Sequence, residues 1–168
     1  VYAYSLKLRN FLKQDDLRDS HIRLLERRLK DMKIKYNRLS RSIYISQSDA
    51  ETFFDILSPR VRENQDEDLK AKLIIGVETH KACFQRQMTK AQVLLKRLHR
   101  WIQQFDDIVG YCQITREVDD DIIEDICRTM KNEKDLNSEI KECIDSSLEI
   151  INKISCRDIS CNNISGCS

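Results

Sequence analysis

Residues 66–109 read DEDLKAKLIIGVETHKACFQRQMTKAQVLLKRLHRWIQQFDDIV. Apolar side chains recur here every three or four positions, with His80 in the one gap: Leu69, Leu73, Val77, Phe84, Met88, Ala91, Leu95, Leu98, Ile102, Phe105 and Val109. This is the period of a single α-helix with one buried stripe. Such a helix would be about 65 Å long at 1.5 Å per residue, so its packing partners must be long as well.

The chain before this stretch predicts a short packed helix at 1–13, one long helix and a second short helix. From Leu17 a stripe of the same period runs to a helix end near Tyr44, through His21, Leu25, Leu29, Met32, Tyr36, Leu39 and Ile43. Ser48–Glu51 has the form of a capping box, which marks a new helix start. Pro59 disfavours the helical region for the residue before it. We therefore expect a separate short helix from Asp49 to about Leu57.

The chain after this stretch predicts a return helix. Gly110 suits the left-handed cap that ends a helix, and Thr115 can cap the next helix. The apolar pattern of that next helix continues to Ile154, with a break or kink expected at Asn132–Asp135.

Composition predicts an all-α fold. The 168 residues include only three Gly and one Pro, and 34% are charged, which suits the outer faces of amphipathic helices. We expect one domain, an elongated antiparallel helical bundle of two or three long helices plus short helices. Its segments are a basic helical segment 1–45, a short helix and turns 46–65, the long central helix 66–110, a return helix or helix pair 115–154, and a Cys-rich tail 155–168.

The cysteines predict secretion. All seven lie after residue 82, and such clustering is typical of a disulfide framework formed in an oxidising compartment. Asn163-Ile164-Ser165 is a glycosylation sequon, and a start at Val1 is what removal of a signal peptide would leave. We therefore expect a secreted glycoprotein that is disulfide-crosslinked in its C-terminal half.

Helix geometry predicts one of the disulfides. If the chain reverses between Gly110 and Thr115, facing residues have numbers that add up to about 226, and Cys83 with Cys143 meets this condition. Cys112 with Cys127 is one option for a second bridge. The pairing of the tail cysteines stays open, and the odd sulfur could join two chains in a covalent homodimer. The tail cysteines are Cys156, Cys161 and Cys167.

Charge is unevenly distributed, although the formal net charge is only +1. Residues 1–45 hold twelve Lys and Arg against five Asp and Glu, whereas residues 111–168 hold seven against thirteen. The basic segment either packs beside the acidic one or offers a face to a polyanion such as a glycosaminoglycan, or to an acidic protein or membrane surface. Nucleic acid is disfavoured because aromatic residues are not interleaved with these charges. The candidate binding residues are Arg23, Arg27, Arg28, Lys30, Lys33, Lys35, Arg38 and Arg41.

The sequence offers little for catalysis or for metal binding. It contains no Gly-rich phosphate loop or nucleophile elbow, so we expect neither enzyme activity nor a cofactor. His80 and Cys83 have the spacing of two metal ligands, but no second pair accompanies them. The acidic residues of Asp119–Asp125 lack a calcium-loop pattern and suit a helix start. No apolar run reaches the roughly 20 residues that span a bilayer.

Three functions from different classes remain. The first is a secreted, non-enzymatic helical protein that binds an extracellular protein, as effectors of parasites or blood feeders and cytokine-like ligands do. The second is a structural or dimerisation coiled coil. The third is a carrier of a small apolar ligand, in a cavity lined by Phe53, Phe54, Phe84 and Trp101. The tail cysteines and the sequon favour the first.

Overall fold

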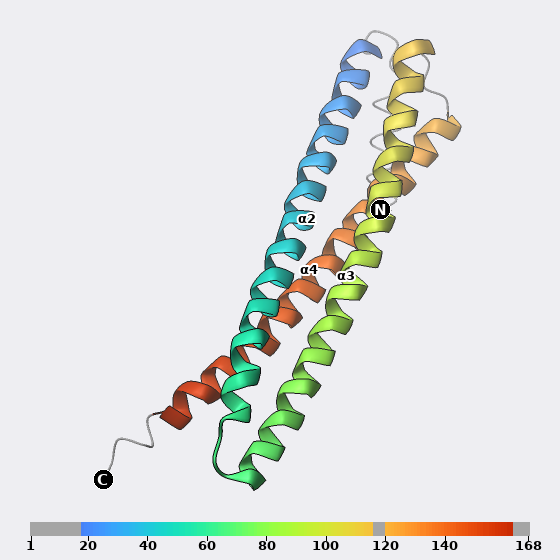
Figure 1. Cartoon of the computed structure of the whole chain (residues 1–168). Helices are drawn as coiled ribbons and strands as arrows, with labels where there is room; N and C mark the ends of the chain where they lie inside the picture. The colour runs from blue at the N-terminus through green and yellow to red at the C-terminus, as the bar shows by residue number, and fades with distance from the viewer. Residues whose placement is uncertain (1–17, 116–119, 163–168) are drawn as a thin grey trace. The chain divides into compact units, whose positions relative to one another are not determined.

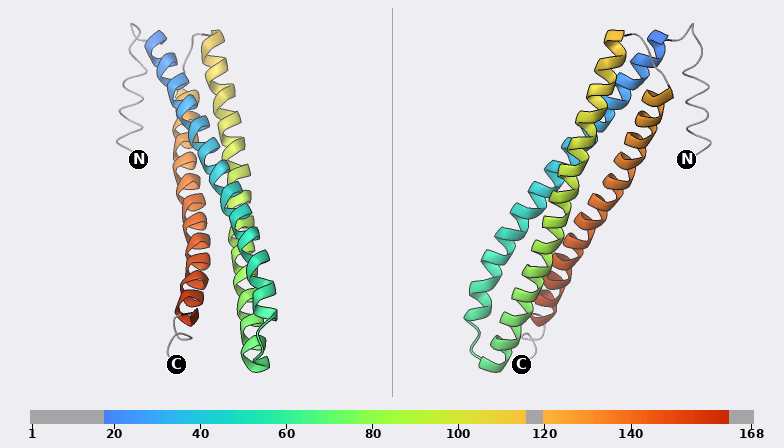
Figure 2. Two further views of the ribbon diagram at one scale, coloured as in Figure 1. Left: turned by 60° about the vertical axis from the view of Figure 1, so that its left-hand side comes forward. Right: turned by 90° about the vertical axis from the view of Figure 1, so that its right-hand side faces the viewer.

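The computed structural model describes residues 18–115 and 120–162, with side chains for 22–115 and 121–155. Over these ranges the chain forms three long helices and no strand: α2 (Arg18–Arg62), α3 (Glu67–Thr115) and α4 (Asp120–Asn162). α3 runs back antiparallel to α2, and α4 runs antiparallel to α3 (Figure 1 and Figure 2). The prediction of an all-α helical bundle is confirmed.

The helices form two compact units. Of the described residues, unit 1 contains 18–39, 94–115 and 120–138, and unit 2 contains 40–93 and 139–162, so each unit contains a part of α2, α3 and α4. The apolar core of unit 1 includes Ile22, Leu25, Leu29, Met32, Leu94, Leu98, Ile102, Phe105, Val109, Ile123, Ile126 and Leu136. The apolar core of unit 2 includes Ile43, Ala50, Phe54, Leu57, Val61, Val77, Phe84, Met88, Ala91, Ile140 and Ile144.

The stripe predicted for the central helix is buried along most of its length. Burial begins at Val77 and continues to Val109, with Leu94 buried where we expected Leu95. At the start of the helix, Leu69 and Leu73 are 44% and 38% exposed. The helical period therefore located the core of α3 correctly, except for its first two turns.

α2 continues through the break that we predicted after Tyr44. The capping box at Ser48–Glu51 and the separate short helix 49–57 are wrong, because Thr52 Oγ1 donates to the Ser48 carbonyl oxygen at 3.0 Å, as hydroxyls do inside a helix. Pro59 also lies within α2, which ends one turn later. A continuous buried face outweighs the local cap signal, since most helix stability comes from packing. That face contains Ile43, Ala50, Phe54, Leu57 and Val61.

α3 begins where the sequence indicated but ends later. Asp66 Oδ1 accepts a hydrogen bond from the Leu69 amide at 3.0 Å, so Asp66 caps the helix start. The predictions that Gly110 ends this helix and that Thr115 caps the next are wrong, because α3 runs through Gly110 and ends at Thr115. A glycine inside a helix costs only about 1 kcal/mol relative to Ala, and burial of Val109 and Cys112 outweighs this cost.

α4 is uninterrupted at Asn132–Asp135, so the predicted break there is wrong as well. Glu133 and Leu136 are both buried on this helix, which keeps the segment packed. Several predictions concern parts of the chain outside the described residues: the helix at 1–13, the side chain of His21, the sulfur atoms of Cys156, Cys161 and Cys167, and the glycosylation site Asn163.

Candidate functional site

The outward side of α2 in unit 1 carries a row of cations. Arg23, Arg27, Lys30 and Arg38 lie on the side of the helix away from its buried stripe, because they recur at helical spacing out of phase with that stripe. All four side chains are exposed, and none forms an ion pair with a described residue. The row is about 22 Å long at 1.5 Å per residue. We call these four residues the α2 basic face.

Two of the predicted binding residues are engaged within unit 1 instead. Lys33 Nζ donates to Asp106 Oδ2 of α3 at 2.9 Å, and Lys35 Nζ donates to Glu133 Oε1 of α4 at 3.3 Å. The interpretation that the basic segment packs internally is therefore correct for these two lysines. The interpretation that it offers a face to a partner stays a prediction for the α2 basic face. Two predicted residues are exposed but do not belong to that face: Arg28, and Arg41, which belongs to unit 2.

Glu133 is a buried carboxylate that the sequence analysis did not single out. Its side chain is 4% exposed, and it accepts hydrogen bonds from Lys35 and from Asn137 Nδ2. A buried carboxylate is strongly destabilising once its cation is removed, so the Lys35 contact fixes α2 beside α4 within unit 1. Two acidic residues lie between Met130 and Leu136, and the available signal was that Glu133, unlike Asp135, is three residues from both and so falls in phase with the apolar pattern.

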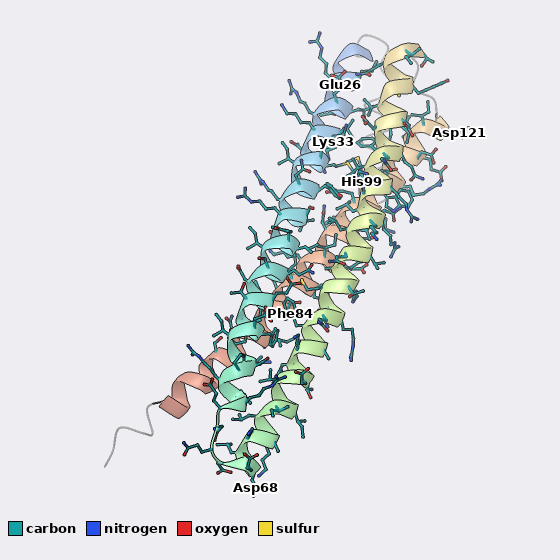
Figure 3. The ribbon with its side chains drawn as sticks, viewed as in Figure 1. Glu26, Lys33, Asp68, Phe84, His99 and Asp121 are labelled. Atoms are coloured by element: carbon teal, nitrogen blue, oxygen red, sulfur yellow. The ribbon has the colours of Figure 1, made fainter. Side chains whose placement is uncertain are left out.

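Two hydrogen bonds join α2 to α3 in unit 1. Gln113 Nε2 donates to Glu26 Oε1 at 2.5 Å, and Lys33 Nζ donates to Asp106 Oδ2 at 2.9 Å. Glu26 and Lys33 lie two turns apart on α2 (Figure 3). The residue numbers in each pair add up to 139. Both contacts therefore share one antiparallel register, which fixes the residues that face each other between them.

A surface pocket of about 360 Å³ lies between these two contacts. In the shared register Leu29 stands opposite Gly110, and both line the pocket together with Ile34, Val109 and Lys30. A Cβ atom built on Gly110 would meet no other heavy atom within 4 Å. A larger side chain at position 110 would therefore extend into open space beside the pocket. Lys30 both lines the pocket and belongs to the α2 basic face.

The predicted Cys83–Cys143 disulfide is wrong. No disulfide joins any two of the cysteines whose side chains are described: Cys83, Cys112, Cys127 and Cys143. The chain reverses later than we expected, because α3 ends at Thr115 and α4 begins at Asp120. The cation that acts on the Cys143 thiol is Lys90, which lies two turns, about 10 Å, beyond Cys83 along α3.

Cys143 is buried in unit 2. Burial raises the pKa of the Cys143 thiol because it disfavours the thiolate; Lys90 opposes this effect, and Glu142 and Glu139 add to it. Since the thiolate is the reactive form of cysteine, this environment suits a packed thiol and not a nucleophile.

Three of the four aromatic residues that we considered for a ligand cavity lie in unit 2 and contact one another there. The rings of Phe54 and Phe84 meet edge to face with centroids 6.2 Å apart, and those of Phe53 and Phe54 with centroids 5.5 Å apart. Such pairs are typical of a filled core. Trp101 is half-buried and belongs to unit 1.

Among the described side chains, no group of three or more His, Cys, Asp and Glu residues could hold a metal ion. In the predicted acidic cluster, Arg128 forms an ion pair with Asp125 at 3.4 Å and approaches Glu124 at 4.0 Å. Within the described ranges, no helix is both long and apolar enough to cross a membrane.

Comparison with known proteins identifies no family for this chain. No protein-family model, no curated protein and no solved structure matches it. The α2 basic face and the adjacent pocket are therefore the features from which a function can be inferred.

Proposed function

We propose that the chain is a non-enzymatic helical binding protein that contacts an acidic protein partner through the α2 basic face. The observation that carries this proposal is the row of four exposed cations, Arg23, Arg27, Lys30 and Arg38, none of which forms an ion pair with another residue in the part of the chain that the structure describes. Charges that a protein does not neutralise itself attract oppositely charged partners and speed their association.

An exposed apolar side chain within this row favours a protein over a polysaccharide. Ile34 lies between Lys30 and Arg38 on the outward side of α2 and is 39% exposed. Leu24, which follows Arg23 in the chain, is 42% exposed. Protein interfaces combine apolar contacts with a charged rim, whereas a sulfated polysaccharide offers little apolar surface to such residues. An acidic protein segment can use both kinds of contact.

We further propose that this partner is extracellular and that the protein is secreted. Support comes from the sequence alone, namely the seven cysteines clustered after residue 82 and the sequon at Asn163. The Cys83–Cys143 bridge does not support this proposal, because the structure does not contain it.

Retention on immobilised polyglutamate tests the proposed surface. We expect the wild-type chain to be retained at low salt and released at moderate salt, because exposed ion pairs are screened. The double variant Arg23→Glu with Arg27→Glu should lose retention. The matched control is Lys96→Glu with Arg97→Glu, which changes two exposed cations of α3 in unit 1 and gives the same net charge.

The control should keep most of the wild-type retention. Equal loss in both double variants would mean that net charge alone determines binding, and would overturn the proposal. Retention on heparin but not on polyglutamate would replace the protein partner by a polysaccharide.

A further inference from the structure

Four charged side chains line the pocket between α2 and α3, namely Glu26, Lys30, Lys33 and Asp106. Glu26 is held by Gln113, and Asp106 is held by Lys33, so three of its charged side chains have partners across the two helices. Lys30 also lines the pocket and forms no ion pair with a described residue. Because Gln113 is neutral, the Glu26 carboxylate keeps its charge, and Glu26 and Lys30 are the two charged lining residues without an ion pair to a described residue. Of these two, Lys30 belongs to the α2 basic face, where Arg27 is one turn away.

The floor of this pocket is apolar, although charged and amide side chains also line it. Leu29 and Val109 are 7% and 2% exposed, so they form a floor, and the partly exposed Ile34 forms a wall. Gly110 contributes no side chain, and the space above it is open. At about 360 Å³ the pocket falls at the lower end of the range for small-ligand sites. It suits a single large side chain better than a whole ligand.

From this juxtaposition we propose that the pocket beside Gly110 receives one large apolar side chain of an acidic partner segment, whose carboxylates lie on the α2 basic face. This inference rests on the proposed function and specifies its partner: an acidic peptide segment with one aromatic or leucine anchor. Binding interfaces commonly depend on one such anchor in a pocket, surrounded by polar contacts that contribute less.

Binding of two labelled peptides, measured by fluorescence anisotropy at low salt, tests this inference. One peptide is a short polyglutamate with a single central tryptophan, and the other carries alanine at that position. We expect the wild-type chain to bind the tryptophan peptide about tenfold more tightly, which corresponds to burial of one large side chain.

Two glycine variants separate the pocket from general effects on α3. Gly110→Leu should abolish the preference for tryptophan, because its side chain fills the pocket. Gly76→Leu is the matched control, since Gly76 lies in α3 within unit 2 and a Cβ there also meets nothing within 4 Å. It should keep the wild-type preference. Gly110→Ala fills the pocket less and should weaken the preference to an intermediate level, with helical circular dichroism unchanged in all three variants.

Failure of this inference differs from failure of the proposed function. If the wild type bound both peptides with equal affinity, and the Arg23→Glu, Arg27→Glu variant bound neither, the proposed apolar anchor would be wrong. The proposal of an acidic partner would then still hold. A tryptophan preference that survives Gly110→Leu would also overturn the anchor. Absence of binding to either peptide would overturn the proposed function itself.

Discussion

Units 1 and 2 contain parts of the same three helices, and both pack α2 against α3 through buried apolar residues and a contact between rings, but the polar contacts beside that core differ. In unit 2, Phe54 and Phe84 meet edge to face across the two helices, and a hydrogen bond joins the neutral side chains of Gln92 and Gln47 at 3.0 Å. In unit 1, the rings of Tyr36 and His99 meet with centroids 5.2 Å apart, the charged side chains of Glu26 and Lys33 make the polar contacts to α3, and a pocket lies between these contacts.

This difference shows how one helix pair can combine a stable core with a binding surface. Aromatic rings fill the space in unit 2 and bury large apolar areas. The half-exposed ion pair of unit 1, with side chains 46% and 51% exposed, adds little stability but leaves surface for a partner. We therefore expect substitutions of fully buried core residues to affect stability most, and substitutions on the α2 basic face to affect binding.

The largest effect should come from the aromatic contact of unit 2. Phe54 is 2% exposed, and Phe54→Ala should reduce the free energy of unfolding by about 3–5 kcal/mol, as removal of a buried phenylalanine does. Urea denaturation followed by circular dichroism measures this change. Phe53→Ala is the control, because Phe53 is only half-buried and should cost less. Equal losses in the two variants would contradict the assignment of Phe54 to the core.

An intermediate effect should distinguish the two lysines of unit 1. Lys35→Met leaves the buried Glu133 carboxylate without its cation and should cost about 1–3 kcal/mol. Lys33→Met breaks only an exposed pair and should cost about 0–1 kcal/mol. Urea denaturation of both variants gives the comparison. If Lys33→Met were the more damaging, Glu133 would not be the buried charge that fixes these helices.

The smallest effect should be the titration of Cys143 in unit 2. Burial raises the pKa of this thiol above its ordinary value of 9.0, so the folded state holds the proton more tightly than the unfolded state. The resulting stabilisation is fully present below the unfolded pKa and is lost as pH rises through the folded pKa. Under reducing conditions, the wild type should therefore lose more stability between neutral and alkaline pH than Cys143→Ala. Identical pH slopes for the two proteins would contradict this prediction.

Some features of the fold could be predicted because their signals are repeated many times along the chain. The apolar stripe from Val77 to Val109 identified the inner face of α3 over several turns. The sequence indicated that α3 begins after Asn64 or Asp66, and the structure identifies Asp66 as the cap, since its carboxylate accepts a backbone N–H that has no partner within the helix. The cations of the α2 basic face were also in the predicted set, although the sequence could not separate them from Lys33 and Lys35.

Other features could not be predicted because weak local signals compete with packing. The capping box at Ser48–Glu51 and the glycine at Gly110 each favour a helix end by about 1 kcal/mol. Both lie within continuous helices whose buried faces contribute more. The error at Gly110 then shifted the expected register of α4, and the proposed partner of Cys83 was wrong for that reason.

The sequence by itself determined the all-α class, the inner faces of the helices and the concentration of positive charge on α2, because helical period and composition are local properties. Only the tertiary structure decided which cations have internal partners and that Leu29 stands opposite Gly110. Such pairings depend on the register between helices, which is set by where α3 ends and by contacts between residues far apart in the chain.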